Sequence, residues 1–325
     1  MRPADSPVDL TTRVGSVLLP NPVMTASGTA GHGAELAGYL DLSRLGAVVV
    51  KSLSAEPWAG NPPPRLAPTA AGMLNSVGLQ GPGVESWLAE DLPALVATGA
   101  RVVASIWGRT VEGFARAAAL LADAPPAVVA VEVNVSCPNL EARDQLFAHS
   151  PSATADVVAA AAACRRPRWA KLSPNTDRLV EVAAAAAGAG AEAVTLVNTL
   201  VGMAIDPVTR RPVLGAARGG LSGPAIHPVA VRAVYDVRTA LPDVAIVGVG
   251  GVRDGPGAVE LLLAGAQAVQ VGTATFAEPR APGLVLDDLV DWCRSHGVRR
   301  VTDLVGAAHA FPPLTSEPSP PDRKT

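Results

Sequence analysis

Short apolar runs alternate with helical stretches along most of this 325-residue chain. Each run is of strand length, and an apolar run of that length bounded by loops is typical of a strand buried in a parallel sheet. The expected strands are Val23–Ala26, Ala47–Ser52, Arg101–Ile106, Ala130–Val135, Trp169–Leu172, Ala193–Val197, Ala245–Val249 and Ala268–Val271. The expected helices are Ala34–Leu45, Val84–Ala97, Val111–Ala122, Ala153–Ala163, Asp177–Ala187, Pro228–Leu241, Pro256–Ala264 and Gly283–Ser295.

Eight strand–helix units in a chain of this length favour an α/β fold of the (β/α)8 TIM barrel type. A doubly wound sheet is the alternative, but it usually has fewer strands, and no Gly-x-Gly-x-x-Gly pattern follows the first strand here. We expect residues 1–311 to form a single barrel domain, with Leu10–Leu19 as an N-terminal β-hairpin that plugs one end. Residues 312–325, rich in proline, serine and charge, are expected to be a disordered tail.

Two long inserts interrupt the repeating pattern, at Ser54–Pro82 and Gly202–Pro224. We expect both to be structureless loops at the active site, because long inserts in barrels usually serve that purpose.

Composition excludes several classes of function. With a net charge of −3 and only 3% aromatic residues, the chain lacks the basic patch and stacking surface of a nucleic-acid-binding protein. Cys137, Cys164 and Cys293 are scattered, with no Cys/His cluster, so no metal site is expected. A sparse, odd cysteine count favours the reducing cytoplasm. The sequence also shows no signal peptide and no apolar run of the ~18 residues that a membrane span needs.

Catalytic side chains in barrels lie at the C-terminal ends of the strands. Here those ends carry Ser27, Lys51, Ser52, Ser105, Asn134, Cys137, Lys171, Asn198, Thr199, Gly250, Gly251, Gly272 and Thr273. The set has two lysines, two asparagines and a thiol but no carboxylate. A glycosidase or a divalent-metal site, both of which need carboxylates, is therefore not expected.

The last two strand ends predict a phosphate site. Gly250-Gly251 and Gly272-Thr273 follow adjacent final strands, where barrels commonly bind phosphate, and glycine lets backbone N–H groups approach an anion. Glycine in ordinary tight turns is the alternative. Lys51 and Lys171 end apolar strands, where a buried ammonium needs an anionic partner unless its side chain reaches back to solvent.

Three asparagines and the thiol complete the candidate site. Asn75, Asn134 and Asn198 could pair donors and acceptors with a cyclic amide, or could be ordinary turn residues. Cys137 could serve as nucleophile, metal ligand or base, and the alternative is a small buried cysteine.

Together these motifs resemble the dihydroorotate dehydrogenase family over roughly Leu10 to Phe276. The motifs are Asn21-Pro22 with Ala26-Ser27-Gly28, Val50-Lys51-Ser52, Gly60-Asn61-Pro62 with Pro64-Arg65, Asn75-Ser76-Val77-Gly78-Leu79, Asn134-Val135-Ser136-Cys137-Pro138-Asn139, Val197-Asn198-Thr199, Gly220-Leu221-Ser222-Gly223, Gly248-Val249-Gly250-Gly251 and Val271-Gly272-Thr273.

The resemblance implies FMN-dependent oxidation of dihydroorotate to orotate in pyrimidine (UMP) biosynthesis. Cys137 would be the base that removes the proton from C5, while the hydride of C6 passes to N5 of FMN. The residues expected to bind FMN are Ser27, Lys51, Ser52, Ser105, Asn134, Lys171, Val197, Gly223, Gly250, Gly251, Gly272 and Thr273. Those expected to bind substrate are Lys51, Asn75, Ser76, Val77, Gly78, Leu79, Asn134, Asn198 and Thr199.

The resemblance also implies a soluble branch of the family, because the quinone-linked branch has serine at the base position and an N-terminal membrane segment. One soluble branch is a homodimer that reduces fumarate. The other is NAD-linked and pairs with a subunit carrying FAD and an iron–sulfur cluster, forming a heterotetramer. The pattern is more similar to the NAD-linked branch, and the NAD chemistry would then reside in that partner.

Two departures from the family pattern bear on substrate and acceptor. Ser105 stands where the family usually has asparagine, followed by bulky Trp107, and the segment after Cys137 is not glycine-rich. Two alternatives therefore stay open: a related dihydropyrimidine oxidoreductase, and a flavin-binding partner subunit that does not turn over dihydroorotate.

Overall fold

The computed structural model describes residues 7–139 and 145–311, so the expected C-terminal tail lies outside the described residues. All eight expected strands form, and they lie parallel in one eight-stranded sheet of order β3-β18-β17-β12-β11-β8-β7-β4. Their bounds are β3 Val23–Thr25, β4 Val48–Val49, β7 Val102–Ile106, β8 Val128–Asn134, β11 Arg168–Lys171, β12 Ala193–Leu196, β17 Ala245–Val249 and β18 Ala268–Val271.

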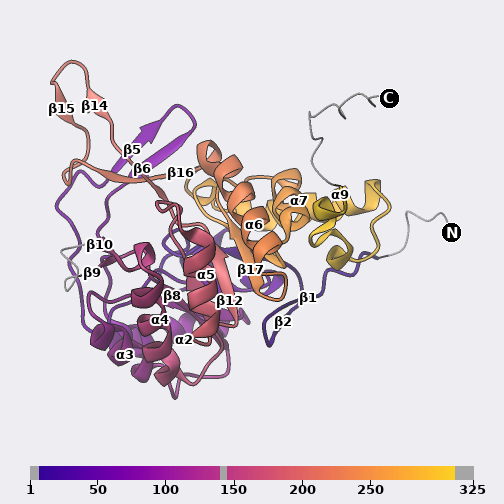
Figure 1. The fold of residues 1–325 in the computed structure, drawn as a ribbon, viewed down its shortest axis with the longest axis horizontal. Helices are drawn as coiled ribbons and strands as arrows, with labels where there is room; N and C mark the ends of the chain where they lie inside the picture. The colour runs from indigo at the N-terminus through magenta and orange to yellow at the C-terminus, as the bar shows by residue number, and fades with distance from the viewer. Residues whose placement is uncertain (1–6, 140–144, 312–325) are drawn as a thin grey trace, which may run out of the picture.

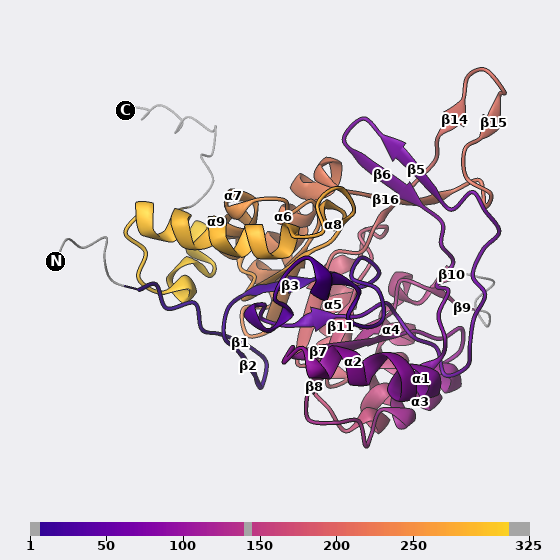
Figure 2. The ribbon, with the colours of Figure 1, turned by 180° about the vertical axis from the view of Figure 1, so that it is seen from behind.

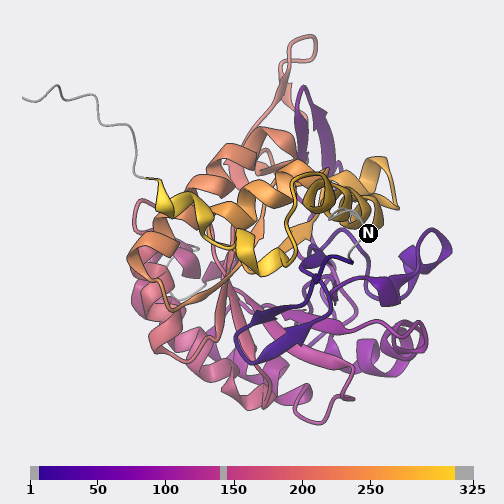
Figure 3. The ribbon, with the colours of Figure 1, turned by 90° about the vertical axis from the view of Figure 1, so that its right-hand side faces the viewer.

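The sheet closes on itself between its two end strands. The Thr25 N–H of β3 donates to the Ala47 carbonyl at 3.3 Å, and the Gly46 N–H donates to the Val23 carbonyl at 2.8 Å. Met24 and Ala47 form a parallel bridge at the same place. The (β/α)8 barrel predicted from the sequence is therefore confirmed, and the helices surround it (Figure 3).

The helices that follow the strands are α1 Val84–Ser86, continued by the π-helical turn η4 Trp87–Asp91 and α2 Leu92–Ala97, α3 Val111–Leu120, α4 Pro151–Ala160, α5 Leu179–Gly188, α6 His227–Ala240, α7 Gly255–Ala264 and α9 Ala281–Ser295. A short helix, α8 Ala274–Ala277, precedes α9. Within the described ranges, no helix has both the length and the apolar character needed to cross a membrane.

One predicted helix, Ala34–Leu45, is wrong. The segment forms two 3-10 turns, η2 Glu35–Gly38 and η3 Leu42–Arg44. The break lies at Asp41, whose backbone is extended (φ −74, ψ 105) and whose carboxylate accepts the Ser43 N–H. An aspartate that caps a new turn competes with continuation of the helix across it.

The N-terminal hairpin closes one end of the barrel, as predicted. Its strands, β1 Thr12–Val14 and β2 Val17–Leu19, pair antiparallel. Val14, Val17 and Leu19 join the barrel's inner cluster, where they pack with residues such as Trp169 of β11. Figure 3 shows this indigo hairpin crossing the end of the barrel. Because this end is filled with apolar side chains, the site must open at the other end.

The two inserts are not structureless, contrary to the prediction. They contribute β5 Leu66–Thr69, β6 Gly72–Asn75, β13 Leu200–Gly202 and β16 Gly219–Ser222 to a four-stranded antiparallel sheet of order β13-β16-β6-β5. A second hairpin, β14 Ile205–Asp206 with β15 Arg211–Pro212, extends beyond it (Figures 1 and 2). Ala67, Leu74 and Leu214 form a small core of their own, which explains why these inserts are ordered.

Candidate active site

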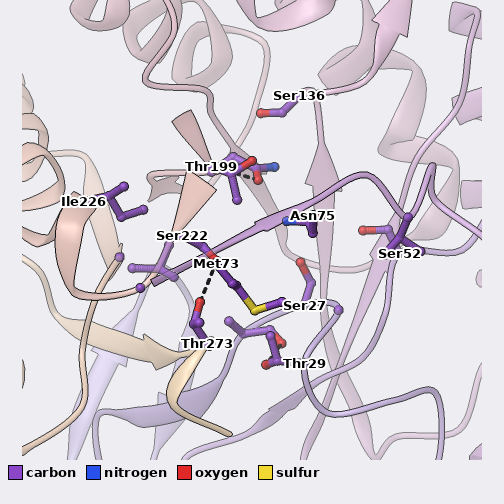
Figure 4. Close-up of a pocket in the computed structure, with 18 of the residues that line it drawn as sticks. Ser27, Thr29, Ser52, Met73, Asn75, Ser136, Thr199, Ser222, Ile226 and Thr273 are labelled. Carbon is purple, nitrogen blue, oxygen red and sulfur yellow. Dashed lines mark hydrogen bonds between the residues drawn. The ribbon is translucent and has the colours of Figure 1, made fainter. Parts of the chain in front are cut away.

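A cavity opens at the C-terminal ends of the barrel strands, beneath the sheet built by the inserts (Figure 4). It brings together nearly all of the predicted site residues. Those that line it are Ser27, Lys51, Ser52, Asn75, Ser76, Val77, Gly78, Leu79, Asn134, Lys171, Val197, Asn198, Thr199, Gly223, Gly250, Gly251, Gly272 and Thr273. Ser105 and Cys137 are not among the residues that line the cavity.

Lys171 is buried in the barrel and held on three sides. Its Nζ donates to Ser27 Oγ at 3.3 Å and to Gln270 Oε1 at 3.2 Å. Glu132 Oε1 lies 3.7 Å from the same nitrogen. With only 4% of its surface exposed, Lys171 does not snorkel into solvent, so that alternative is wrong.

Lys51 lies on the same cavity, but its side-chain ammonium has no hydrogen-bond or ion-pair partner among the described residues. Burial, and then the positive charge of Lys171, lower the pKa of Lys51 to about 8. A cationic group held in this way, without a counter-ion, is suited to an anionic ligand.

Glycine is required at the turns where a phosphate is expected. Gly223, Gly250 and Gly251 have φ values of +96, +142 and +70, which residues other than glycine rarely adopt. A Cβ on Gly250 would lie 2.7 Å from the Cβ of Ala230 on α6. His227 Nδ1 donates to the Gly250 carbonyl at 2.7 Å and fixes this turn at the start of α6.

Thr273, on the neighbouring turn, ties the barrel to the insert sheet. Its hydroxyl donates to Ser222 Oγ of β16 at 2.7 Å (Figure 4). The rim of the cavity is therefore cross-braced beside the glycine turns.

Amide and hydroxyl groups form another part of the wall. Asn198 Nδ2 donates to Asn134 Oδ1 at 3.2 Å, and Asn75 Nδ2 donates to the Gly220 carbonyl at 3.2 Å. The buried hydroxyls of Ser76 and Ser136 both line the cavity without a hydrogen-bond partner among the described residues. Unsatisfied polar atoms of this kind cost free energy unless a ligand or water pairs with them.

Cys137 does not line the cavity in this structure. Its fully buried thiol donates to the carbonyls of Gly108 at 3.1 Å and Asn134 at 3.3 Å. Burial raises the pKa of the thiol to about 12, and hydrogen bonding to the backbone of Gly108 and of Cys137 itself, which lowers it, does not offset the burial. In this arrangement the thiol therefore carries its proton at neutral pH.

Ser105 lies one layer below the predicted flavin wall. It is fully buried on β7, and its Oγ is 2.9 Å from Ser52 Oγ, which lines the cavity. Its Oγ also donates to Glu132 Oε1 at 3.4 Å. In the described structure Ser105 therefore supports Ser52 rather than forming the cavity surface.

Glu132 and Gln270 were missed by the sequence analysis. Both are fully buried on barrel strands, and Gln270 Nε2 donates to Glu132 Oε2 at 2.8 Å. The sequence analysis found no carboxylate among the residues at the strand ends, and this holds. Glu132 lies deeper in the barrel, two residues before Asn134 on the same face of β8. A charged residue inside an apolar strand run was the signal available in the sequence.

A tryptophan pair beside the cavity was also missed. Trp58 of the first insert packs edge-on against Trp107, with ring centroids 5.7 Å apart. The Trp58 indole N–H donates to the carbonyl of Gly78, a cavity residue, at 3.0 Å. This pair braces the segment that carries Ser76, Val77, Gly78 and Leu79.

The closed barrel, with glycine turns and two lysines around one cavity at the ends of its strands, has the architecture of a barrel enzyme with a site suited to an anionic ligand. The family model for dihydroorotate dehydrogenase matches residues 9–292. The chain belongs to the dihydroorotate dehydrogenase family of oxidoreductases. The family and the dihydroorotate oxidation expected from the sequence are thereby confirmed.

Curated relatives extend over most of the chain. One, from Desulforudis audaxviator, is 49% identical over 91% of this chain and 96% of its own length. Another, from Pelobacter propionicus, is 47% identical over 92% of this chain and 98% of its own length. Both are named dihydroorotate dehydrogenase B (NAD(+)), catalytic subunit.

A solved structure agrees on the fold. Dihydroorotate dehydrogenase of Eimeria tenella, in complex with ferulenol, matches with a TM-score of 0.74 at 21% identity, covering 93% of this chain and 89% of that one.

Proposed function

We propose that the oxidation of dihydroorotate to orotate uses FMN bound in the cavity, and that this chain is the catalytic subunit of an NAD-linked enzyme. The observation that carries the proposal is the pair of lysines on one cavity, one of them without a counter-ion, beside positive-φ glycine turns. This arrangement supplies separate anchors for a phosphate, a flavin ring and a second anion.

The chain's residues fit FMN. Gly223, Gly250, Gly251, Gly272 and Thr273 would hold the phosphate end, since their backbone N–H groups are open to close approach. Ser27, Lys51, Ser52, Asn134, Lys171 and Val197 would surround the ring and ribityl chain, with Ser105 behind Ser52. When bound, FMN supplies a two-electron acceptor for the hydride of C6.

The substrate would lie against the amide wall. Asn75, Ser76, Val77, Gly78, Leu79, Asn134, Asn198 and Thr199 would surround the dihydropyrimidine ring. Lys51 would pair with the carboxylate of the substrate, which restores the counter-ion that this lysine lacks. The unpartnered Ser76 and Ser136 hydroxyls would then find acceptors or donors on the ligand.

Cys137 is the proposed base. In this step the C5–H bond breaks, its proton goes to Sγ in the thiolate form, and the electron pair forms the C5–C6 double bond as hydride leaves C6. Sγ must therefore lose its own proton beforehand and turn from the Gly108 carbonyl toward the cavity. The distance to cover is short, because the adjacent residue Ser136 lines the cavity.

The proposal also covers the electron acceptor and the assembly of this chain with other subunits. The described residues contain no group of metal-ligating side chains, and the relatives' names describe a catalytic subunit of an NAD(+) enzyme. A partner with FAD and an iron–sulfur cluster would carry electrons to NAD in a heterotetramer, the homodimer being the alternative. We place this single barrel domain, residues 1–311, in the cytoplasm.

A flavin titration tests the proposal. The purified chain is supplied with FMN, freed of excess, and its cofactor is identified by mass. Anaerobic dihydroorotate should then bleach the flavin absorbance, while dihydrouracil should not. Bleaching by dihydrouracil alone would identify a related dihydropyrimidine oxidoreductase. Bound flavin that neither compound bleaches would identify a partner subunit without turnover.

A further inference from the structure

A buried polar layer lies inside the barrel, directly beneath the cavity. Its members come from β7, β8, β11 and β18, and they meet at the carboxylate of Glu132. None of Glu132, Gln270 and Ser105 is solvent exposed, and none of them lines the cavity. Their role must therefore be exerted through other residues.

One branch joins Glu132 to Lys171. Gln270 accepts from Lys171 Nζ through Oε1 and donates to Glu132 through Nε2. Since an ammonium can only donate, the amide oxygen must face Lys171, and the amide nitrogen must face Glu132. Glu132 is thus an acceptor for Gln270.

The second branch runs from Glu132 to the amide wall. Ser105 donates its single proton to Glu132, so the hydrogen bond between the two serines must be donated by Ser52. Ser52 then accepts from Asn134 Nδ2 at 3.3 Å. Asn134 in turn accepts from Asn198 Nδ2 through Oδ1.

Every hydrogen bond in this branch therefore points the same way, toward the carboxylate. The sequence of donors is Asn198, Asn134, Ser52 and Ser105, and the final acceptor is Glu132. Hydrogen bonds in such a chain polarise one another, and reversing one member requires reversing its neighbours. Glu132, which cannot donate, sets the direction of the two serine hydroxyls. The two amides are held separately by backbone groups, because the Ser136 N–H donates to Asn134 Oδ1 at 3.1 Å and the Thr199 N–H donates to Asn198 Oδ1 at 2.8 Å.

We propose that Glu132 is a positioning residue whose carboxylate, through Ser105, fixes the direction of the Ser52 hydroxyl. Ser52 Oγ then presents acceptor lone pairs, rather than its proton, to the Asn134 amide and to the cavity that it lines. The inference that the ligand of this cavity is orotate rests on the proposed function. The direction of the Ser52 hydroxyl does not, because it is a property of the chain itself.

The first experiment needs neither cofactor nor substrate. The side-chain amide signals of Asn134 are assigned in 15N-labelled apoprotein by Asn134→Asp substitution. Glu132→Gln can donate as well as accept, and Ser105→Ala removes the link, so both should shift these signals and speed exchange of their protons with water. Thr195→Val is the matched control, because the fully buried Thr195 hydroxyl has no hydrogen-bond partner in the described structure.

The second experiment measures orotate binding to the FMN-loaded protein through the flavin spectrum. Ser105→Ala and Glu132→Gln should each weaken orotate binding by about three- to tenfold, as expected for a lost or reversed hydrogen bond. The double variant should be no weaker than Glu132→Gln alone, because both changes interrupt one chain. Ser105→Thr, which keeps the hydroxyl, should restore binding.

The outcomes are distinct. Additive losses in the double variant, or amide signals of Asn134 that stay unchanged in Ser105→Ala, would overturn the proposal. If Glu132→Gln does not fold, Ser105→Ala alone decides between these outcomes. If the wild-type protein binds no orotate while the amide signals still respond, the proposed function fails and the positioning role stands.

Discussion

Cys137 Sγ lies 3.1 Å from the carbonyl oxygen of Gly108, and Cys137 does not line the cavity. The neighbouring residue, Ser136, faces the cavity instead. The proposed base and an uncommitted hydroxyl are therefore neighbours in the chain, but only the hydroxyl belongs to a residue that lines the cavity. Substituting each residue in turn therefore distinguishes an effect on the chemical step from an effect on ligand binding at the cavity wall.

Cys137→Ala should keep FMN bound but slow flavin reduction by dihydroorotate by roughly two to four decades, the usual contribution of a general base. Ser136→Ala is the control and should change substrate affinity more than the rate of reduction. Rapid-mixing absorbance measurements give both quantities. Near-normal reduction in Cys137→Ala would remove the thiol from the mechanism.

The reduction rate should also depend on pH in a defined direction. The pKa of the Cys137 thiol is raised to about 12 in the described arrangement, so it carries its proton at neutral pH and cannot accept another. Reduction should therefore accelerate as pH rises from 7 toward 10, because more of the protein holds thiolate. A rate that is flat over this range would show that ligand binding itself brings the thiol into an environment with a lower pKa.

The two lysines should separate by role. Lys171→Met should lower the midpoint potential of bound FMN, because a cation beside the developing negative charge is gone. A fall of roughly 30 to 60 mV is expected, since ~30 mV is tenfold for a two-electron couple. Lys51→Met should mainly weaken orotate binding. An unchanged or higher potential in Lys171→Met, measured by dye-linked titration, would contradict the electrostatic role.

The lowered pKa of Lys51 should also affect how the stability of the ligand-free protein changes at alkaline pH. Its pKa is lowered from 10.5 to about 8 on folding, so between these values the unfolded chain binds the proton and the folded chain does not. Stability should therefore rise with pH across this window relative to Lys51→Met. Urea unfolding of both proteins at pH 7 to 10 measures the difference. A difference that shrank or stayed constant with pH would show that the pKa is not depressed.

Trp58→Phe should weaken orotate binding by about three- to tenfold with little loss of stability. The change keeps an aromatic ring against Trp107 but removes the hydrogen bond to Gly78. Trp107→Phe is the counterpart, because the buried Trp107 N–H has no partner in the described ranges. It should cost roughly 1 to 3 kcal/mol of stability through lost packing, and leave binding near normal. Orotate titration and thermal unfolding together distinguish the two.

Most of the barrel could be predicted because its strands are buried on both faces. Runs such as Ala193–Val197 are apolar along their whole length, and the order of such runs specifies the fold. The prediction of a helix at Ala34–Leu45 was wrong because the spacing of apolar residues does not reveal that the Asp41 carboxylate accepts the Ser43 N–H and starts a new turn. The strands in the inserts were missed because they pair with strands far away in the sequence. Asn75 of β6, for example, pairs with Gly220 of β16.

The cavity residues were predictable for a related reason. The C-terminal ends of all the barrel strands meet at one end of the barrel, so polar residues at those ends are brought to the same cavity. Lys171 and Asn134 are neighbours on adjacent strands, as their position in the runs implies. The layer beneath was not predicted, since Gln270 of β18 and Glu132 of β8 lie on strands that are not neighbours in the sheet and meet only inside the closed barrel. The direction in which the Cys137 side chain points depends on loop geometry, which strand periodicity does not specify.

The sheet shared by the two inserts has an evolutionary consequence. In many barrels each loop can lengthen or shorten independently, and new specificities arise by such changes. Here β6 and β16 are register partners that carry the cavity residues Asn75 and Ser222. A one-residue deletion in either strand would turn the side chains of that strand to the opposite face of the sheet. Ligand preference in this lineage should therefore diverge by replacement of individual side chains rather than by insertion and deletion.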